Sequence, residues 1–162
     1  MQLRTQVKKL LAKELGPRVD SLEDSGQFGH DALKKMGELG LAAPMLPEPH
    51  GLGSLMAQLI VAEEMAYVSA GFGLSVLASV CLFGANVGRN GTEEQKKKYL
   101  PGIASGAKIG CWALTEPATG SDAVSIRTRC LRDGNDYILN GSKTFITNAP
   151  MADYFIILAR EY

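Results

Sequence analysis

Residues 112–122 have the sequence WALTEPATGSD, the stretch that best indicates the fold of this chain. The segment starts as a short apolar strand and runs into a turn rich in hydroxyl groups. Gly120 lets the backbone approach a ligand, and the N–H groups of such a turn, with Ser and Thr hydroxyls, form a concave site suited to phosphate. A structural turn whose polar side chains cap their own backbone accounts for the same residues. On the residues alone, the structural turn is the favoured alternative.

Downstream of this segment, the sequence predicts a β-meander. Residues 126–130 alternate between apolar or small side chains and Arg, the pattern of a half-buried strand. Residues 137–139 and 143–147 are the next two expected strands, separated by an Asn-Gly pair at residues 140–141 that favours a type I′ turn. Residues 154–159 are apolar without interruption, which predicts a strand covered on both faces.

Upstream, the pattern is helical. The predicted helices occupy residues 3–15, 32–39, 55–65 and 93–100. Ser54 is the expected N-cap of the third helix. Thr92 and Gln95 are expected to form a capping box at the start of the fourth helix, and Pro101 to end it. The sequence therefore predicts a helical bundle followed by a β part, with the boundary near Ala107.

Residues 65–88 contain no Asp, Glu, Lys or Arg, and the stretch is long enough to cross a bilayer. Its Gly, Ser and Asn residues dilute the apolar character, Gly71 is expected to break the helix, and no basic cluster flanks it. We therefore expect a central buried helix of the bundle and no membrane span. Its small side chains would allow either close helix packing or space for an apolar ligand.

Composition and charge exclude several classes of protein. The 162 residues are 46% apolar and 21% charged, which excludes a disordered chain. The 17 Lys and Arg residues balance the 17 Asp and Glu residues, so we expect no nucleic-acid surface and no anionic-membrane surface. The three Cys and two His residues lack metal-ligand spacing, and no metal site is expected. The familiar Gly-rich nucleotide loops and the GxSxG nucleophile motif are absent.

Residues 113–122, with Ser125 three residues further on, closely resemble a signature of acyl-CoA dehydrogenases. Other segments resemble the same family in the same order, so that the resemblance covers essentially the whole chain. They are residues 37–41 with 47–48, residues 89–96 with 99–101, and residues 139–143 with 146–148. Two places depart from the family pattern. Thr119 adds bulk beside the signature turn, and residues 50–53 form a shortened glycine loop.

The resemblance implies that two segments bind FAD. The implied cofactor contacts are Trp112, Ala113, Leu114, Thr115, Gly120, Ser121, Phe145, Ile146 and Thr147. Trp112 would pack near the flavin, and Thr115 would hydrogen-bond its ring system. Ser121 would contact both the pyrophosphate and the bound acyl-CoA substrate. Phe145 would present an aromatic face, although its pattern alone favours an ordinary core aromatic, and the Thr147 hydroxyl would lie by the flavin nitrogen that receives hydride.

The fold class implied is α+β. An all-α helical bundle, residues 1–107, would be followed by the first strands of an antiparallel β-barrel-like, flavin-binding domain, residues 108–162, which looks truncated. The implied reaction is α,β-desaturation of an acyl-CoA thioester with hydride transfer to FAD. No catalytic residue is expected within the chain, because the family's carboxylate base would lie beyond residue 162. Glu116 is expected to be a structural carboxylate that caps local N–H groups, and the chain alone is expected to be inactive.

The resemblance also implies partners and a location. Electron-transferring flavoprotein would accept the electrons, and the full-length protein would be a homo-oligomer, either a tetramer or a dimer. It would lie in a bacterial cytoplasm or in the mitochondrial matrix. Two alternatives stay open: an acyl-CoA oxidase or another flavin oxidase on the same scaffold, and an inert, truncated helical module without cofactor that serves as an interaction surface.

Overall fold

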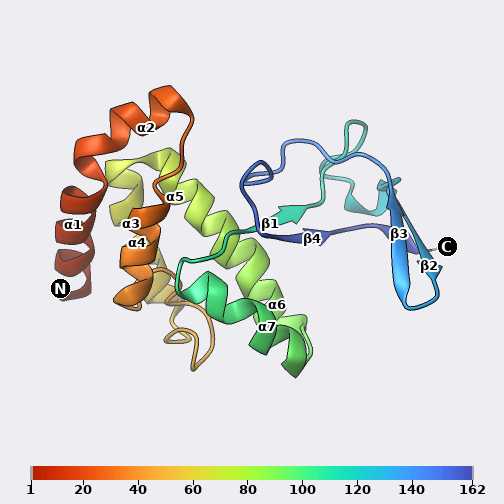
Figure 1. Cartoon of the computed structure of the whole chain (residues 1–162), viewed down its shortest axis with the longest axis horizontal. Helices are drawn as coiled ribbons and strands as arrows, with labels where there is room; N and C mark the ends of the chain where they lie inside the picture. Colours follow the sequence, from red (N-terminus) through yellow and green to blue (C-terminus); the bar gives the residue numbers. More distant parts are fainter. Residues whose placement is uncertain (1, 162) are drawn as a thin grey trace.

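The computed structural model describes residues 2–161, with a helical bundle at one end and a β part at the other (Figure 1). The helical elements are α1 (Gln2–Glu14), η1 (Gly16–Arg18), α2 (Val19–Ser25), α3 (His30–Glu38), α4 (Leu55–Val68), α5 (Ala70–Leu77), η2 (Ala78–Gly84), α6 (Ala85–Asn90), α7 (Glu93–Ala104) and η3 (Ala123–Ser125). The strands are β1 (Gly110–Ala113), β2 (Arg129–Asp133), β3 (Asp136–Asn140), β4 (Tyr154–Ile157) and β5 (Arg160–Glu161). The α+β class is therefore confirmed.

The main hydrophobic core lies in the helical part, where the expected helices form. Val7 and Leu11 of α1 are fully buried, and α1 packs against α4. Arg4 of α1 joins the same two helices, because its guanidinium donates to Glu63 and Glu64 of α4 at 2.6 Å each. In α1 and α3 the periodic apolar residues bury one face of the helix as predicted, whereas Leu55 and Leu59 of α4 are exposed.

The local capping predictions are confirmed, but the expected end of α7 is wrong. The Ser54 hydroxyl accepts from the Ala57 N–H at 3.2 Å, and Thr92 and Gln95 form both hydrogen bonds of the capping box. Pro101 lies inside α7, which continues to Ala104. A proline inside a helix costs one hydrogen bond and some steric strain. The extra turn offsets that cost because it buries Ile103.

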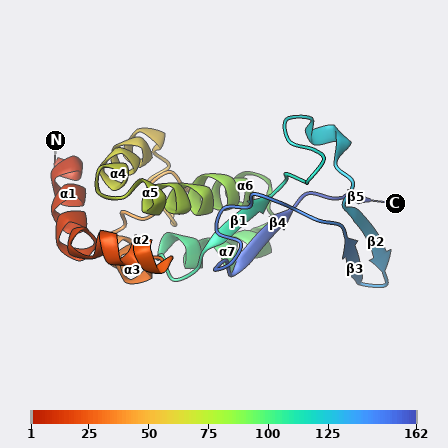
Figure 2. The ribbon, with the colours of Figure 1, turned by 90° about the horizontal axis from the view of Figure 1, so that it is seen from above.

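The uncharged stretch divides at Ser69: residues 65–68 end α4, and the rest lies in one continuous helical run, Ala70–Asn90, made of α5, the π-helical segment η2 and α6 (Figure 2). The expected break at Gly71 is wrong. The chain breaks at Ser69, whose backbone is extended and whose hydroxyl accepts from the Phe72 N–H at 3.2 Å. By length and composition this run could cross a membrane, and 44% of its most apolar window is buried inside the protein. It is buried on one face only, since Leu74 and Leu82 are exposed.

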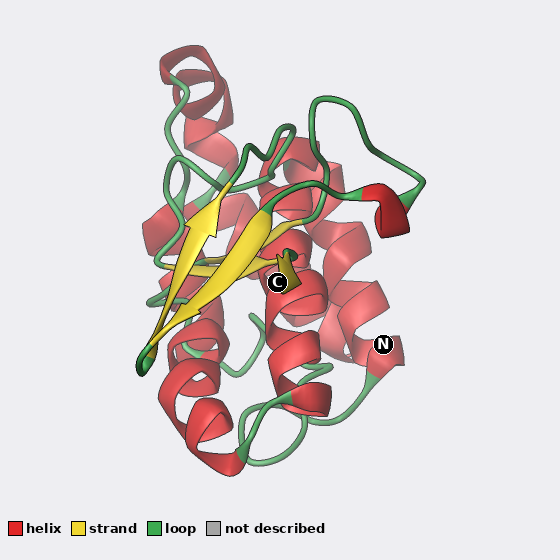
Figure 3. Cartoon of the chain, turned by 90° about the vertical axis from the view of Figure 1, so that its right-hand side faces the viewer, coloured by secondary structure: helices red, strands yellow, loops and turns green. Residues whose placement is uncertain are grey.

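The strands form two small sheets, and the expected antiparallel, barrel-like arrangement is not confirmed, because two of the three strand pairs are parallel. β1 and β4 pair in parallel, with Cys111 opposite Phe155. β2 pairs antiparallel with β3 and in parallel with β5. No sheet closes within residues 2–161. Figure 3 shows the β2–β3 hairpin in front of the helices when the molecule is viewed from its β end.

Two details of the expected meander are also wrong. The strand predicted in residues 143–147 does not form, and Asn140 lacks the positive φ that a type I′ turn requires. Instead, this segment hydrogen-bonds to the chain that leaves β1. The apolar run of residues 154–159 does contain a strand, β4, but it is covered on one face only, because Phe155 and Ile157 are exposed. The burial alternation of residues 126–130 is confirmed, although β2 starts only at Arg129.

Candidate functional site

The structure brings together the two segments that carry the predicted cofactor contacts. The N–H of Thr144 donates to the carbonyl oxygen of Thr115 at 3.0 Å. The Lys143 ammonium donates to the carbonyl oxygen of Leu114 at 2.8 Å. Residues 143–147 therefore lie beside the end of β1 although about thirty residues separate the two in sequence. This proximity takes the place of the strand pairing expected from the meander.

Glu116 is the centre of this region. Its carboxylate accepts from the Arg127 N–H at 2.6 Å, from the Thr128 N–H at 2.9 Å, from the Thr128 hydroxyl at 2.6 Å and from the Lys143 ammonium at 2.9 Å. We call Glu116, Arg127, Thr128 and Lys143 the Glu116 cluster. The expectation that Glu116 is a structural carboxylate capping local N–H groups is confirmed.

The surroundings of Glu116 determine its ionisation. The hydrogen bond from the Thr128 hydroxyl, followed by that from Lys143, lowers the pKa of the Glu116 carboxyl to about 2, and the two backbone N–H groups act in the same direction against the effect of burial. At neutral pH the group is therefore an ion with four donors on its two oxygens. Such a carboxylate is a weak base.

The signature loop, residues 116–128, is tied at its base and open at its tip. Glu116 and Thr119 exchange two backbone hydrogen bonds, of 2.9 and 3.1 Å, which close the first turn. The bulkier Thr119 of this sequence is buried, and its hydroxyl donates to the carbonyl oxygen of Ser125 at 3.3 Å. Gly120 and Ser121 lie exposed at the tip, where a Cβ added to Gly120 would meet no atom within 4 Å. The Ser121 hydroxyl makes no hydrogen bond to any residue that the structure describes.

Residues 145–147 are held in place at both ends. On one side lies the Glu116 cluster, and on the other Asn148, which is buried and donates to the carbonyl oxygens of Ser75 at 2.8 Å and of Gly110 at 3.2 Å. Between these anchors, Phe145 has a positive φ of 55° and a side chain that is 91% exposed. The alternative that Phe145 is an ordinary core aromatic is therefore wrong for residues 2–161, whereas Ile146 and Thr147 are half-buried.

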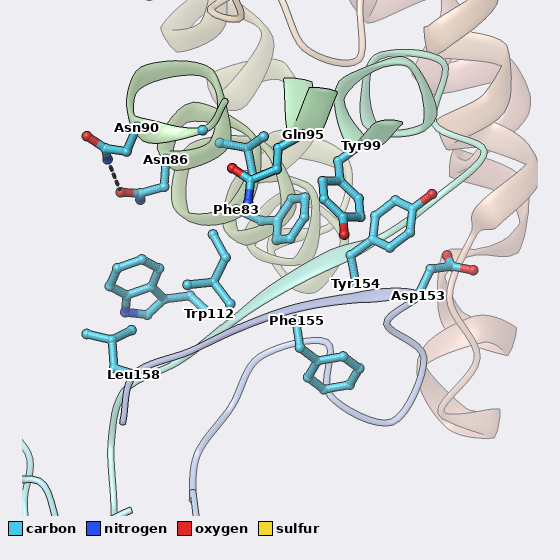
Figure 4. A pocket seen from close by; sticks show the side chains of 13 residues that line it. Phe83, Asn86, Asn90, Gln95, Tyr99, Trp112, Asp153, Tyr154, Phe155 and Leu158 are labelled. Carbon is cyan, nitrogen blue, oxygen red and sulfur yellow. Dashed lines mark hydrogen bonds between the residues drawn. The ribbon is translucent and has the colours of Figure 1, made fainter. Parts of the chain in front are cut away.

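Trp112 faces a different region, a cavity of about 630 Å³ between β1, β4 and the helices α6 and α7 (Figure 4). Phe83, Tyr99 and Tyr154 line the same cavity, and Phe155 points away from the helices on the opposite face of β4. Neither the signature loop nor residues 145–147 contribute to this cavity. The structure thus groups Thr115 with the segment 145–147, but it directs the Trp112 side chain toward the helices.

Two of the anchoring residues had no predicted role. Lys143 and Asn148 belong to segments that carry the family resemblance, but lysine is rarely buried and asparagine is common in turns, so neither residue type indicates an anchor. The available sequence signal was the family resemblance of these segments, and it indicated no contact partner for either residue. Their function as anchors comes from contacts between distant segments.

The helical bundle followed by strands is a fold that this chain shares with known acyl-CoA dehydrogenases. The chain belongs to the acyl-CoA dehydrogenase family. Residues 1–107 match the acyl-CoA dehydrogenase N-terminal domain, and residues 111–162 match the acyl-CoA dehydrogenase middle domain.

Individual relatives agree with this assignment. Mitochondrial isovaleryl-CoA dehydrogenase of Pongo abelii is 41% identical over 164 residues, which cover 98% of this chain and 38% of that relative. Glutaryl-CoA dehydrogenase from Mycobacterium smegmatis in complex with FADH2 is 33% identical with a TM-score of 0.90, covering 99% of this chain and 42% of that chain. A chain of the electron transferring flavoprotein structure of Acidaminococcus fermentans is 36% identical with a TM-score of 0.90, covering 98% and 42%. The chain therefore spans well under half the length of these relatives.

Proposed function

We propose that the full-length protein is a FAD-dependent acyl-CoA dehydrogenase that introduces an α,β double bond into an acyl-CoA thioester. The observation that carries this proposal is the convergence of the signature loop with residues 143–148 through the Glu116 cluster. Bound FAD would accept the β hydrogen of the substrate as hydride. Family membership supports the chemistry, and the geometry of the two segments supports the place where the cofactor would bind.

The groups exposed at the tip of the signature loop and at Phe145 fit such a cofactor. The proposed contacts are Trp112, Ala113, Leu114, Thr115, Gly120, Ser121, Phe145, Ile146 and Thr147. The tip of the signature loop offers an accessible backbone at Gly120 and a hydroxyl at Ser121 for a phosphate oxygen. The exposed ring of Phe145 offers a flat apolar face for an aromatic ring system. Ser121 would also contact the acyl-CoA substrate.

We assign no catalytic base to these residues. Glu116 directly follows the proposed contact Thr115, and its four donors and low pKa do not suit a base that removes an α proton. The base would come from a part of the full-length protein beyond residue 162. The division into a helical domain, residues 1–107, and a β domain that starts at residue 108 is part of the same proposal.

The partners follow from the reaction. Electrons taken from the substrate need an acceptor, for which we propose electron-transferring flavoprotein. We also propose that the full-length protein is a homo-oligomer, a tetramer or a dimer, in a bacterial cytoplasm or in the mitochondrial matrix. The names of the relatives support both locations, since one is mitochondrial and another is from Mycobacterium smegmatis.

The experiment is to purify the full-length protein, record its visible spectrum and incubate it with acyl-CoA thioesters of several lengths and an artificial electron acceptor. We expect a flavin spectrum that is bleached by substrate and the formation of 2-enoyl-CoA. Rapid oxidation of the reduced protein by oxygen, with release of hydrogen peroxide, would identify an acyl-CoA oxidase instead. A protein that binds no flavin would contradict both assignments and would favour an inert interaction module.

A further inference from the structure

We propose that Glu116 and Lys143 are positioning residues that set the relative placement of the three segments proposed to contact FAD. These segments are the end of β1, the tip of the signature loop, and residues 145–147. The inference rests on the proposed function for the identity of the cofactor. The geometry that supports it is internal to the described chain.

The Glu116 backbone follows directly from Thr115, two residues beyond the end of β1, and its carboxylate reaches the far end of the signature loop. One of its oxygens, Oε2, accepts from the N–H of Arg127, and the other, Oε1, accepts from Thr128 twice, so that the carboxylate closes the base of the loop that carries Ser121. This side chain is therefore a direct link between the start of the loop and its end.

Lys143 links the Glu116 carboxylate to residues 145–147. Lys143 places its ammonium between Glu116 Oε1, at 2.9 Å, and the carbonyl oxygen of Leu114, at 2.8 Å. The backbone bond from Thr144 to Thr115 lies directly beside this link. Since residues 143–147 form no strand, no sheet ladder holds them, and these contacts, together with those of Asn148 on the other side, hold Phe145 in place.

The ion pair between Glu116 and Lys143 is buried. The Glu116 side chain is 5% exposed and that of Lys143 is 11% exposed. An ion pair shielded from water in this way is not a solvated surface pair, and loss of one partner leaves the other charge without compensation. Three donors meet on Oε1 and one on Oε2, so a Gln amide at this position would place an N–H₂ group against at least one donor. The cluster therefore requires a carboxylate and a cation together.

The test compares the full-length wild-type protein with Glu116→Gln, Lys143→Met, the double variant and a milder variant, Thr128→Val, which removes one hydroxyl donor. Glu64→Gln is the matched control, because Glu64 is also a buried carboxylate, 8% exposed, paired with the distant Arg4 at 2.6 Å. It lies in α4, at the end of the molecule opposite the β2–β3 hairpin (Figure 1).

Three quantities are measured: the FAD dissociation constant, the flavin absorption spectrum and midpoint potential at saturating FAD, and the hydrogen exchange rate of the Thr144 N–H in the apoprotein. We expect Glu116→Gln and Lys143→Met to raise the FAD dissociation constant about tenfold or more. We also expect both variants to shift the flavin absorption spectrum and the midpoint potential, and to raise the hydrogen exchange rate of the Thr144 N–H. Thr128→Val should act in the same direction with a smaller effect. Because the two residues act as a unit, the double variant should lose less than the sum of the single variants.

Glu64→Gln should lower the stability of the protein and leave all three quantities unchanged. The positioning role is overturned if the Glu116 cluster variants have the same flavin spectrum and midpoint potential as Glu64→Gln at saturating FAD, and if their Thr144 N–H exchanges at the wild-type rate. If the wild-type protein itself binds no FAD, the proposed function fails, and the exchange rate of Thr144 still decides whether the cluster positions residues 143–147. If Glu116→Gln does not fold, Thr128→Val supplies the same comparison.

Discussion

Glu116 shows how one side chain links the stability of the protein to pH. The pKa of its carboxyl in the folded protein, about 2, lies below the usual value of 4.5. A lowered pKa means that the ionised form favours folding, so the contribution is complete above about pH 4.5 and is lost as the pH falls through 2. The ionised carboxylate is thus part of the folded structure at any physiological pH.

Glu116→Gln should therefore destabilise the protein at pH 7, and the difference from wild type should shrink as the pH falls from 4.5 toward 2. The measurement is urea unfolding of both proteins at a series of pH values, followed by circular dichroism. Two curves that stay parallel over this interval would show that Glu116 is not ionised against its four donors.

Ser121 tests the proposed pyrophosphate contact. In the full-length protein, Ser121→Ala would lose a hydrogen bond to a charged group, worth about 1.5–3 kcal/mol. We expect the affinity for FAD to fall at least several-fold in a fluorescence titration. Ser21→Ala, an exposed serine in α2 that hydrogen-bonds only within the helical part, is the control. Unchanged FAD affinity in Ser121→Ala would remove Ser121 from the site.

The contact between β1 and η2 joins the β part to the helical bundle. The Gly110 N–H donates to the Ser79 hydroxyl at 2.9 Å, and a Cβ on Gly110 would lie 2.3 Å from Cγ of Phe83. This close approach requires glycine for steric reasons, because the strand passes directly over a buried aromatic ring. The position of the whole site relative to the helices depends on this contact.

Gly110→Ala should therefore destabilise the protein by about 1–3 kcal/mol, because the added methyl group overpacks the interface. Gly120→Ala is the matched control: its methyl group would meet no atom within 4 Å, and its effect on stability should stay within about 0.5 kcal/mol. Denaturant unfolding of both variants measures the difference. Equal stabilities would mean that β1 does not pack on η2 as described.

The helical run Ala70–Asn90 has the length and apolar composition of a membrane span, yet one of its faces packs against the bundle and β1. We expect the full-length protein to stay in the supernatant when cells are lysed without detergent. The measurement is fractionation followed by washes of the membranes with high salt and carbonate. A protein that resists both washes would favour the membrane span over the bundle helix.

For the molecule as a whole, we predict that a polypeptide of residues 1–162 does not catalyse desaturation, even with FAD and acyl-CoA in excess. A base must lie about 3 Å from the proton it removes. Glu116, which directly follows the proposed contact Thr115, accepts from four donors and does not suit that role. The assay uses an artificial electron acceptor and detects 2-enoyl-CoA. Turnover above a denatured-protein control would place a base within these residues.

The polypeptide of residues 1–162 also exposes several large apolar side chains. Leu55, Met56 and Tyr67 of α4 and Phe145 are all largely exposed in residues 2–161. An apolar surface of this kind promotes association, so we also expect the 162-residue polypeptide to self-associate in size-exclusion chromatography.

Local interactions made much of the structure predictable from the sequence alone. Ser54 and the Thr92–Gln95 pair cap helices within three or four residues, so their pattern needs no distant partner. The periodic apolar residues of α1 and α3 predicted which helix faces are buried. The family resemblance pointed to the segments 112–122 and 145–147, which the structure places close to each other through Thr115 and Thr144.

Contacts between distant segments decided the rest. The helix α7 passes through Pro101 because burial of Ile103 outweighs a local penalty, and β1 pairs in parallel with a strand that starts more than forty residues later. Residues 143–147 do not form the expected strand, because Lys143 hydrogen-bonds to Glu116 and to the carbonyl oxygen of Leu114. A local pattern specifies hydrogen bonds within one turn or hairpin. Only the tertiary structure determines which distant group a buried charge or strand edge meets, because that choice depends on the packing of the whole chain.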